Sequence, residues 1–187
     1  GLADVMIAAG TESMSVMPQI MGNKMSMNPA IFAREENIGI AYGMGLTAEK
    51  VAKQWGVSRD EQDAFAVASN QKACAAIAAG YFKAETTPYA ISESLPDLKT
   101  GLIKLRERTV DTDEGPRADS SMANLAKLKP VFHARGSVTA GNSSQMSDGA
   151  AAVMIVSEKI LREHNLTPLA RFAGYAVGGV APEIMGI

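Results

Sequence analysis

Small residues dominate one stretch of the chain, residues 136–152, with the sequence GSVTAGNSSQMSDGAAA. It holds three glycines among serine, threonine, asparagine and alanine residues. Small side chains let a backbone pass very close to a ligand or a catalytic centre, while hydroxyl and amide side chains stabilise tight turns. The sequence therefore predicts a loop here that can line a binding site.

The bulk composition is that of an ordinary globular protein. The 187 residues are 47% hydrophobic and 20% charged, with a net charge of −2. Because acidic residues slightly outnumber basic ones, nucleic acid is not an expected partner. No apolar run is long enough to span a bilayer. One cysteine excludes an internal disulfide framework and a cysteine-cluster zinc site, and two histidines leave little for a metal site. We expect no metal and no organic cofactor.

The chain begins with Gly1 and enters an apolar segment, residues 3–10, almost at once. Apolar residues at consecutive positions predict a buried strand of a parallel sheet whose two faces are covered by helices. A domain seldom begins in the middle of a core strand. We interpret the chain as an internal fragment, so that any targeting segment is out of view.

Helices and strands are expected to alternate at both ends of the chain. Cap residues and apolar patterns predict four helices. The first, 48–55, is capped by Thr47 and ends at Gly56, and the second, 59–79, begins with a Ser58–Glu61 capping box and stops at Gly80. The other two are about 122–127, capped by Ser120 or Ser121, and 158–163, capped by Ser157. Further strands are predicted at 102–105 in a hairpin, 150–156 and 171–180. This order predicts an α/β layered core that carries a large inserted lobe.

Three features allow both a simple structural and a functional interpretation. The methionine-rich segment 16–37 is either a packing surface or a loop that contacts another subunit. Cys74 has no histidine or arginine beside it in the sequence, which favours a small buried residue over a nucleophile. Residues 111–114, DTDE, lack the spacing of a calcium loop and are interpreted as a solvated turn.

Four stretches in this order resemble the thiolase family. They are AGTESMS (9–15), MGLTAEKVA (44–52), SRDEQDAFA (58–66) and the small-residue stretch 136–152. The resemblance implies the central part of an acetyl-CoA acyltransferase, which cleaves 3-ketoacyl-CoA with coenzyme A (CoA) or joins acyl-CoAs by Claisen chemistry. CoA and acyl-CoA are then substrates and partners, and CoA is not a prosthetic group.

The resemblance also implies a domain organisation. The thiolase fold has two similar α/β halves, with a loop domain inserted in the first half. Residues 1–15 and 147–166 would belong to the N-terminal domain, residues 16–146 to the loop domain that covers CoA, and residues 167–187 to the start of the C-terminal domain. A homo-oligomer, dimer or tetramer, is implied for the full-length protein, with segment 16–37 in a subunit contact. A bacterial-like cytoplasmic location is expected.

The catalytic motifs of the family are not found in this sequence. Thiolases use a nucleophilic cysteine in a Cys-Ser-Ser-Gly-like turn, a histidine in Gly-His-Pro and a second cysteine in Cys-x-Gly-Gly-Gly. Cys74 lacks a glycine-rich turn, and His133 and His164 precede Ala134 and Asn165. We therefore assign no catalytic residue and expect this polypeptide alone to be inactive. A non-catalytic thiolase-like protein that binds acyl-CoA or lipid is the alternative for the whole protein. We also expect the isolated chain to aggregate or to be partly molten, because an incomplete sheet exposes edges and apolar faces.

Six positions match family residues that contact CoA or border its pocket: Arg117, Ser144, Ala140, Phe132, Asn124 and Met44. Arginine suits phosphate contact and ring stacking. Without the resemblance, a surface arginine and a core aromatic would describe Arg117 and Phe132 equally well.

Two positions depart from the family pattern. Asn124 stands where a serine often contacts CoA. Gly43 replaces a histidine that many short-chain thiolases carry before the Met-Gly pair. The second change opens the pocket and suggests a degradative enzyme with broader specificity.

Overall fold

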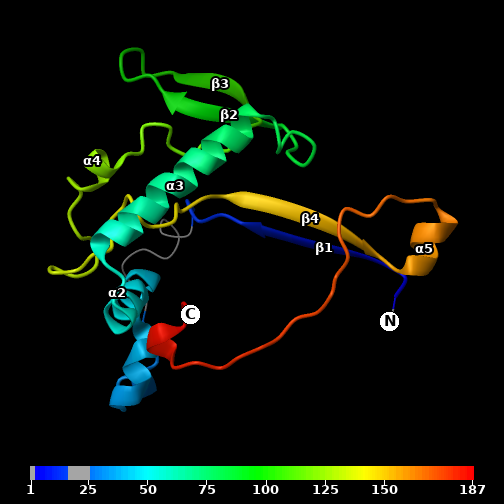
Figure 1. The fold of residues 1–187 in the computed structure, drawn as a ribbon. Helices are drawn as coiled ribbons and strands as arrows, with labels where there is room; N and C mark the ends of the chain where they lie inside the picture. Colours follow the sequence, from blue (N-terminus) through cyan, green and yellow to red (C-terminus); the bar gives the residue numbers. More distant parts are fainter. Residues whose placement is uncertain (1–2, 17–25) are drawn as a thin grey trace. The chain divides into compact units, whose positions relative to one another are not determined.

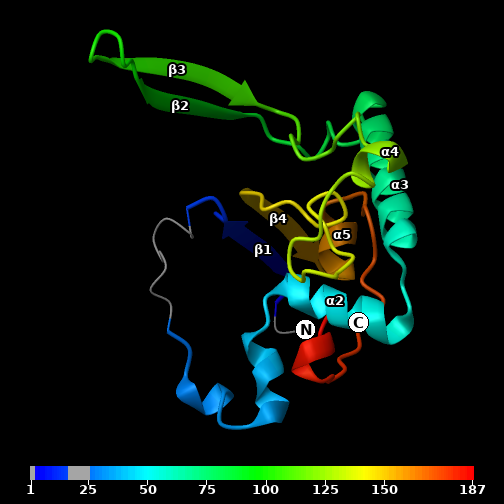
Figure 2. The ribbon, with the colours of Figure 1, turned by 90° about the vertical axis from the view of Figure 1, so that its left-hand side faces the viewer.

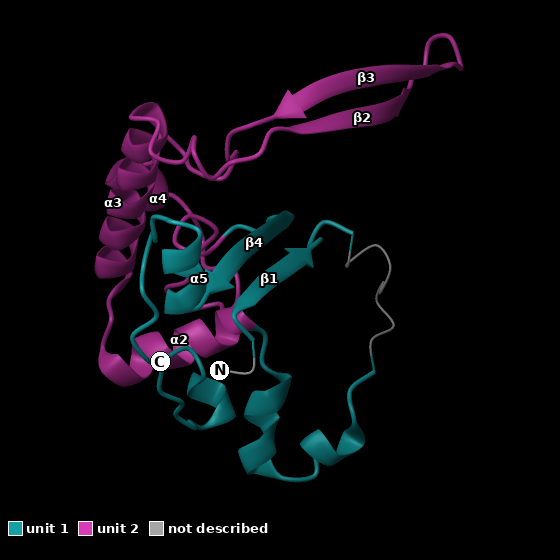
Figure 3. Ribbon diagram, turned by 90° about the vertical axis from the view of Figure 1, so that its right-hand side faces the viewer, with its two compact units in different colours: residues 1–43, 145–187 teal, residues 44–144 magenta. Residues whose placement is uncertain are grey.

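The computed structural model describes residues 3–16 and 26–187. The chain forms two compact units, Gly1–Gly43 with Gln145–Ile187, and Met44–Ser144 (Figure 3). The second unit falls inside the predicted inserted domain, whose boundaries at residues 16 and 146 stay a prediction. We refer to these as unit 1 and unit 2 and describe each by itself.

Unit 1 contains a two-stranded ribbon. β1 (Val5–Glu12) pairs with β4 (Gly149–Val156) in an antiparallel register that runs from Val5 opposite Val156 to Glu12 opposite Gly149 (Figure 1). Both strands lie where the sequence predicts them. The predicted parallel arrangement is wrong, because apolar runs mark a strand but do not fix the direction of a partner that is distant in sequence.

The ribbon is also not buried as predicted. All eight residues of β1 are exposed, and so are the first seven of β4. In the part of the chain that the structure describes, these two strands pair only with each other, so each strand has one edge without a partner strand. Apolar side chains of both strands are left in solvent: Val5, Met6, Ile7, Val153, Met154 and Ile155.

Short helices complete unit 1. They are the 3-10 turns η1 (Pro29–Ile31), η2 (Glu35–Ala41) and η3 (Pro182–Ile184), and α5 (Glu158–Glu163), which Ser157 caps as predicted. The strand predicted at 171–180 does not form: no strand among residues 3–16 and 26–187 pairs with it, and Phe172 and Tyr175 stay 78% and 83% exposed. Residues 17–25 of the methionine-rich segment 16–37 lie outside the described residues.

Two helices form the frame of unit 2. α2 (Met44–Trp55) ends at Gly56, whose φ of 66° needs a residue without a side chain, as predicted. α3 (Arg59–Ala78) begins at the predicted capping box and ends before Gly80, with φ of 75°. Thr47 does not cap α2. The helix already begins at Met44, so Thr47 lies inside it. Only 2% of the surface of Thr47 is exposed.

The rest of unit 2 is a hairpin and one short helix. β2 (Tyr89–Pro96) and β3 (Ile103–Val110) form the predicted antiparallel hairpin (Figure 2). α4 (Met122–Leu125) is capped by Ser121 and is shorter than predicted. Beyond it, the backbone continues as hydrogen-bonded turns to Leu128.

The most buried side chains of the described chain all belong to unit 2. They are Thr47, Asp63, Leu125, Val138 and Thr139, each at most 5% exposed. Three of the five are polar, so this core depends on hydrogen bonds as well as on apolar contact. No helix among the described residues is long and apolar enough to cross a membrane.

Candidate functional site

Residues 136–144, the part of the small-residue stretch that belongs to unit 2, are folded onto α2 and the N-terminal part of α3. Val138 and Thr139 are buried, whereas Ala140 and Ser144 are exposed. Small side chains permit this course, because a Cβ atom on Gly141 would stand 2.6 Å from Leu128 Cδ1 and 2.9 Å from Leu125 Cγ. The loop therefore has a fixed inner side and an open outer side.

One carboxylate from α2 fixes the start of the loop. Glu49 accepts hydrogen bonds from the backbone N–H groups of Ser137 at 3.0 Å and Val138 at 2.9 Å, and from the Ser137 hydroxyl at 3.3 Å. A Cβ atom on Gly136 would stand 2.1 Å from Glu49 Oε1, so glycine is needed for the carboxylate to come this close. Hydrogen bonds from backbone N–H groups to a charged acceptor are among the stronger ones.

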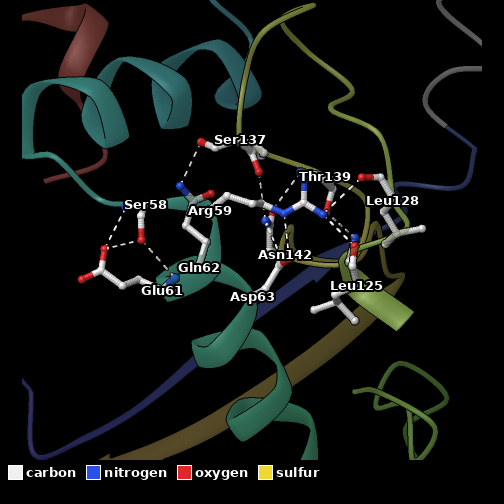
Figure 4. A network of polar contacts seen from close by, with 12 residues as sticks. Ser58, Arg59, Glu61, Gln62, Asp63, Leu125, Leu128, Ser137, Thr139 and Asn142 are labelled. Atoms are coloured by element: carbon white, nitrogen blue, oxygen red, sulfur yellow. Dashed lines mark hydrogen bonds and ion pairs between the residues drawn. The ribbon is translucent and has the colours of Figure 1, made fainter. Parts of the chain in front are cut away.

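A second carboxylate, from α3, fixes the end of the loop (Figure 4). Asp63 is 2% exposed and receives hydrogen bonds from Arg59 Nε at 2.7 Å and Asn142 Nδ2 at 2.9 Å. The same Asn142 accepts from the Thr139 N–H at 2.7 Å and donates to the Ser137 carbonyl at 3.1 Å. Asn142 thus ties the two ends of the loop to each other and to α3.

Arg59 extends this network to the segment after α4. Its Nη2 donates to the carbonyl oxygens of Leu125 at 2.6 Å and Leu128 at 3.1 Å. On the other side of the loop, Gln62 Nε2 donates to the Ser137 hydroxyl at 2.9 Å. No buried side-chain nitrogen or oxygen in the described chain lacks a hydrogen-bond partner, so the network is complete as it stands.

Neither Glu49 nor Asp63 is among the site residues predicted from the sequence. Both nevertheless lie in stretches that carry the family resemblance, 44–52 and 58–66. A carboxylate on a helix is usually solvated, and its contact with a loop about 80 residues away along the chain is a tertiary fact. The family resemblance of those two stretches was therefore the only hint that the sequence offered. The loop residues that Glu49 and Asp63 contact could not be predicted from it.

The six predicted CoA contacts all lie in unit 2 and all are exposed. Met44 and Phe132 come close together: Met44 opens α2, and the Phe132 ring lies over the next residue, with its Cγ 2.2 Å from a Cβ built on Gly45. An alanine at that position would collide with the ring. Phe132 is 44% exposed, so it is not the core aromatic of the alternative interpretation.

Arg117 and Asn124 share a neighbour, Asp119. The Arg117 guanidinium forms a two-pronged contact with the Asp119 carboxylate, at 3.2 and 3.1 Å, and Asn124 Nδ2 donates to the Asp119 carbonyl at 3.1 Å. The side-chain hydrogen bonds between Arg117 and Asp119, with the attraction between their charges, raise the pKa of Arg117 and lower the pKa of Asp119. Asn70 Oδ1 accepts from the Arg117 N–H at 2.8 Å and holds the backbone. The guanidinium is thus an exposed cation on a fixed backbone.

The reactive residue types of the chain are scattered. Cys74 is only half-buried within α3, so the predicted burial is partial. His133 Nδ1 accepts from the Arg135 N–H at 3.2 Å, and His164 ends α5 in the other unit. Among the described residues, no group of three or more histidine, cysteine or acidic side chains is placed to hold a metal ion.

The family profile "Thiolase, N-terminal domain" matches residues 1–159. Two similar curated proteins are an acetyl-CoA acetyltransferase of Pseudomonas aeruginosa, 44% identical, and the peroxisomal 3-ketoacyl-CoA thiolase 2 of Arabidopsis thaliana, 47% identical. Each match covers 100% of this chain but only 48% and 39% of the relative. The chain thus spans less than half the length of these relatives.

Solved structures agree with the sequence matches. The dimeric peroxisomal thiolase of Saccharomyces cerevisiae matches 99% of this chain with a TM-score of 0.82 and 34% identity, over 44% of its own length. The human mitochondrial 3-ketoacyl-CoA thiolase in complex with CoA matches with a TM-score of 0.75 and 36% identity, over 46% of its length. These findings confirm the predicted α/β thiolase-like fold. The chain belongs to the thiolase family, and most of it to the N-terminal domain of that family.

Proposed function

We propose that the whole protein is an acyltransferase that cleaves 3-ketoacyl-CoA with CoA or runs the reverse Claisen condensation. This chain contributes the surface that holds CoA. The observation that carries the proposal is the loop 136–144, which two helix carboxylates fix from the inner side while Ala140 and Ser144 face solvent. Relatives that cover the full chain carry acetyl-CoA acetyltransferase and 3-ketoacyl-CoA thiolase names, which supports the same substrate class.

The exposed groups of unit 2 suit the different parts of CoA. The small Ala140 and the Ser144 hydroxyl suit the pantetheine arm, which is narrow and carries amides. The Phe132 ring offers an exposed apolar face for the adenine or the pantetheine, and Met44 beside it borders the acyl pocket. Arg117 suits the phosphates or the adenine ring, and Asn124 can donate and accept hydrogen bonds.

The same surface sets what this chain does in the reaction. It binds and orients the thioester arm, and it supplies neither the nucleophile nor the base. Those steps need a cysteine thiolate that takes the acyl group and a histidine that activates it. We assign them to parts of the protein outside this sequence.

The remaining features of the whole protein are proposals of the same kind. We infer a homo-oligomer, dimer or tetramer, with segment 16–37 in a subunit contact. The domain boundaries implied by the resemblance, and a cytoplasmic location, belong to this proposal as well. Light scattering of the full-length protein tests the oligomer, since a monomer would contradict it.

Replacing Arg117 by alanine in the full-length enzyme tests the role of this surface. We expect the KM for CoA to rise about tenfold while kcat and the KM for pantetheine, which lacks the nucleotide, stay unchanged. Arg162→Ala is the control, because Arg162 is also an exposed arginine paired with a carboxylate, Glu158. Equal losses on both thiols would argue against a nucleotide role for Arg117.

The alternative, a non-catalytic protein that binds acyl-CoA or lipid, predicts a different pair of results for the full-length protein. Calorimetry would detect CoA binding, whereas the kinetic assay would show no thiolysis of an acetoacetyl thioester. The sequence of the full-length protein decides between the two as well, because the catalytic reading requires both cysteine motifs and the Gly-His-Pro motif.

A further inference from the structure

Glu49 lies at the tightest contact between α2 and the small-residue loop. We propose that Glu49 is a positioning residue for CoA: its carboxylate sets the backbone of Ser137 and Val138, and this presents Ala140 and Ser144 to the pantetheine arm. The inference rests on the proposed function of the loop and assigns part of that function to a residue that need not touch the ligand.

The geometry shows how one side chain controls the backbone. Glu49 Oε1 accepts from two consecutive N–H groups, those of Ser137 and Val138, at 3.0 and 2.9 Å. Two N–H groups that converge on one oxygen fix the orientation of both peptide planes. Val138 follows with 5% exposure, and its carbonyl accepts from the Val131 N–H at 3.0 Å, which closes the loop against the preceding segment.

Gly136 supports a specific role for the carboxylate. With a Cβ atom placed 2.1 Å from Oε1 and 2.6 Å from Cδ, no other residue at position 136 leaves the Glu49 side chain where it is. The loop sequence and the helix sequence therefore fit each other at this point. A loop held only by apolar contact would not need this clearance.

Helix α2 also joins the loop to the acyl end of the predicted site. Met44 opens the helix, the Phe132 ring packs on Gly45, and Glu49 follows on the same helix. A shift of α2 would therefore move the pocket-bordering Met44 and the loop anchor together. This places Glu49 where it can hold the pantetheine loop in register with the pocket.

The test compares Glu49→Ala, Glu49→Gln and Gly136→Ala in the full-length protein. Alanine removes every acceptor, whereas glutamine keeps one oxygen for the two N–H groups. Gly136→Ala keeps glutamate at position 49 but pushes its carboxylate away from the loop. Glu85→Gln is the control, since Glu85 is an exposed carboxylate of the same unit. Thermal melting checks that each variant folds.

Two measurements are made on each variant. Calorimetry gives the Kd for CoA and for pantetheine, and amide hydrogen exchange reports the protection of Ser137 and Val138. We expect Glu49→Ala and Gly136→Ala to weaken both ligands roughly ten- to hundredfold and to expose the two amides. Glu49→Gln is expected to lie between them and the wild type. Loss for both ligands separates this role from that of Arg117, which concerns CoA alone.

The outcomes are distinct. If the wild type binds CoA and the Glu49 variants lose amide protection but keep both affinities, Glu49 does not position the ligand and the inference is wrong. Unchanged amide protection in folded Glu49→Ala would also overturn it. If the wild-type protein binds neither CoA nor pantetheine, the proposed function itself fails. Failure of Glu49→Ala to fold leaves Glu49→Gln and Gly136→Ala to decide.

Discussion

Two regions of this chain are built from small and apolar residues, and the structure treats them in opposite ways. In unit 2, the loop 136–144 is folded onto helices and ties its backbone to Glu49 and Asp63. In unit 1, the ribbon of β1 and β4 has its own ladder of hydrogen bonds, but its apolar faces are open. Small side chains thus permit close packing only where a partner is present.

The difference shows what each region depends on. The loop depends on a few polar contacts that reach across the sequence, and in the described chain no buried side-chain nitrogen or oxygen is left without a partner. The ribbon offers apolar surface and pairing edges that the described residues do not cover. Aggregation or partial melting of the isolated chain therefore stays a prediction, and a single cooperative melt of monomeric material would contradict it.

The largest effect is expected from Asp63→Asn in the loop network. One oxygen of Asp63 faces Arg59 Nε–H and the other faces Asn142 Nδ2–H, so either orientation of the new amide sets a donor against a donor. Arg59 also loses its buried countercharge. We expect a loss of about 3–5 kcal/mol in the free energy of unfolding, measured by urea denaturation.

Asp60→Asn is the matched control for that experiment. It removes the same charge from the first turn of α3, but Asp60 is exposed. The expected cost is the helix-dipole contribution alone, about 0.3–1 kcal/mol. Similar losses for both variants would mean that the network does not hold the loop, and the contrast between the two regions would fail.

The fold was predictable from sequence where its causes are local. Ser58, Ser121 and Ser157 all cap helices as predicted, because a cap needs only the next three residues. Gly56 and Gly80 end helices for the same local reason, a positive φ. The four-residue pattern of a capping box is therefore strong evidence in a single sequence.

Apart from Thr47, which lies inside α2 instead of capping it, the main errors share one physical cause, which is dependence on distant parts of the chain. The direction and exposure of β1 depend on β4, and the failure of residues 171–180 to form a strand depends on the lack of a neighbour. In the candidate site, the exposed residues were named from the family resemblance, and their roles stay predictions. Glu49 and Asp63 were missed because their partners are set by tertiary contact.

A matched pair of glycine substitutions sharpens the comparison at a smaller scale. Gly141→Ala in the loop places a Cβ atom 2.9 Å from the Cγ of the buried Leu125, so we expect a loss of about 1–3 kcal/mol. Gly10→Ala in β1 meets nothing within 4 Å. Since glycine weakens a strand, this change is expected to stabilise by about 0.5–1 kcal/mol.

Denaturant melts of the two glycine variants measure the change in the free energy of unfolding for each. Circular dichroism before the melt compares the secondary structure of each folded variant with that of the wild type. Opposite signs are the expected result. A loss for Gly10→Ala as large as that for Gly141→Ala would show that the ribbon is packed as tightly as the loop, contrary to the exposure of its residues.

The smallest effect concerns the hydrogen bonds between Ser15 and Asp148 at one end of the ribbon, which we call the polar clasp. Asp148 accepts hydrogen bonds from the Ser15 hydroxyl at 2.6 Å and the Ser15 N–H at 2.9 Å, and these contacts lower the pKa of Asp148 from its ordinary value of 3.8. A lowered carboxyl pKa stabilises the fold when the pH is above the ordinary pKa, and this stabilisation is lost as the pH falls through the pKa of the folded state.

Ser15→Ala should therefore raise the pKa of Asp148 toward 3.8, which carbon NMR titration of the carboxyl group measures. The stability difference between Ser15→Ala and the wild type should be present at pH 7 and should vanish in acid. An Asp148 pKa that does not move would show that the clasp is not formed in solution, and the ribbon would then have no polar tie comparable to those of the loop at this end.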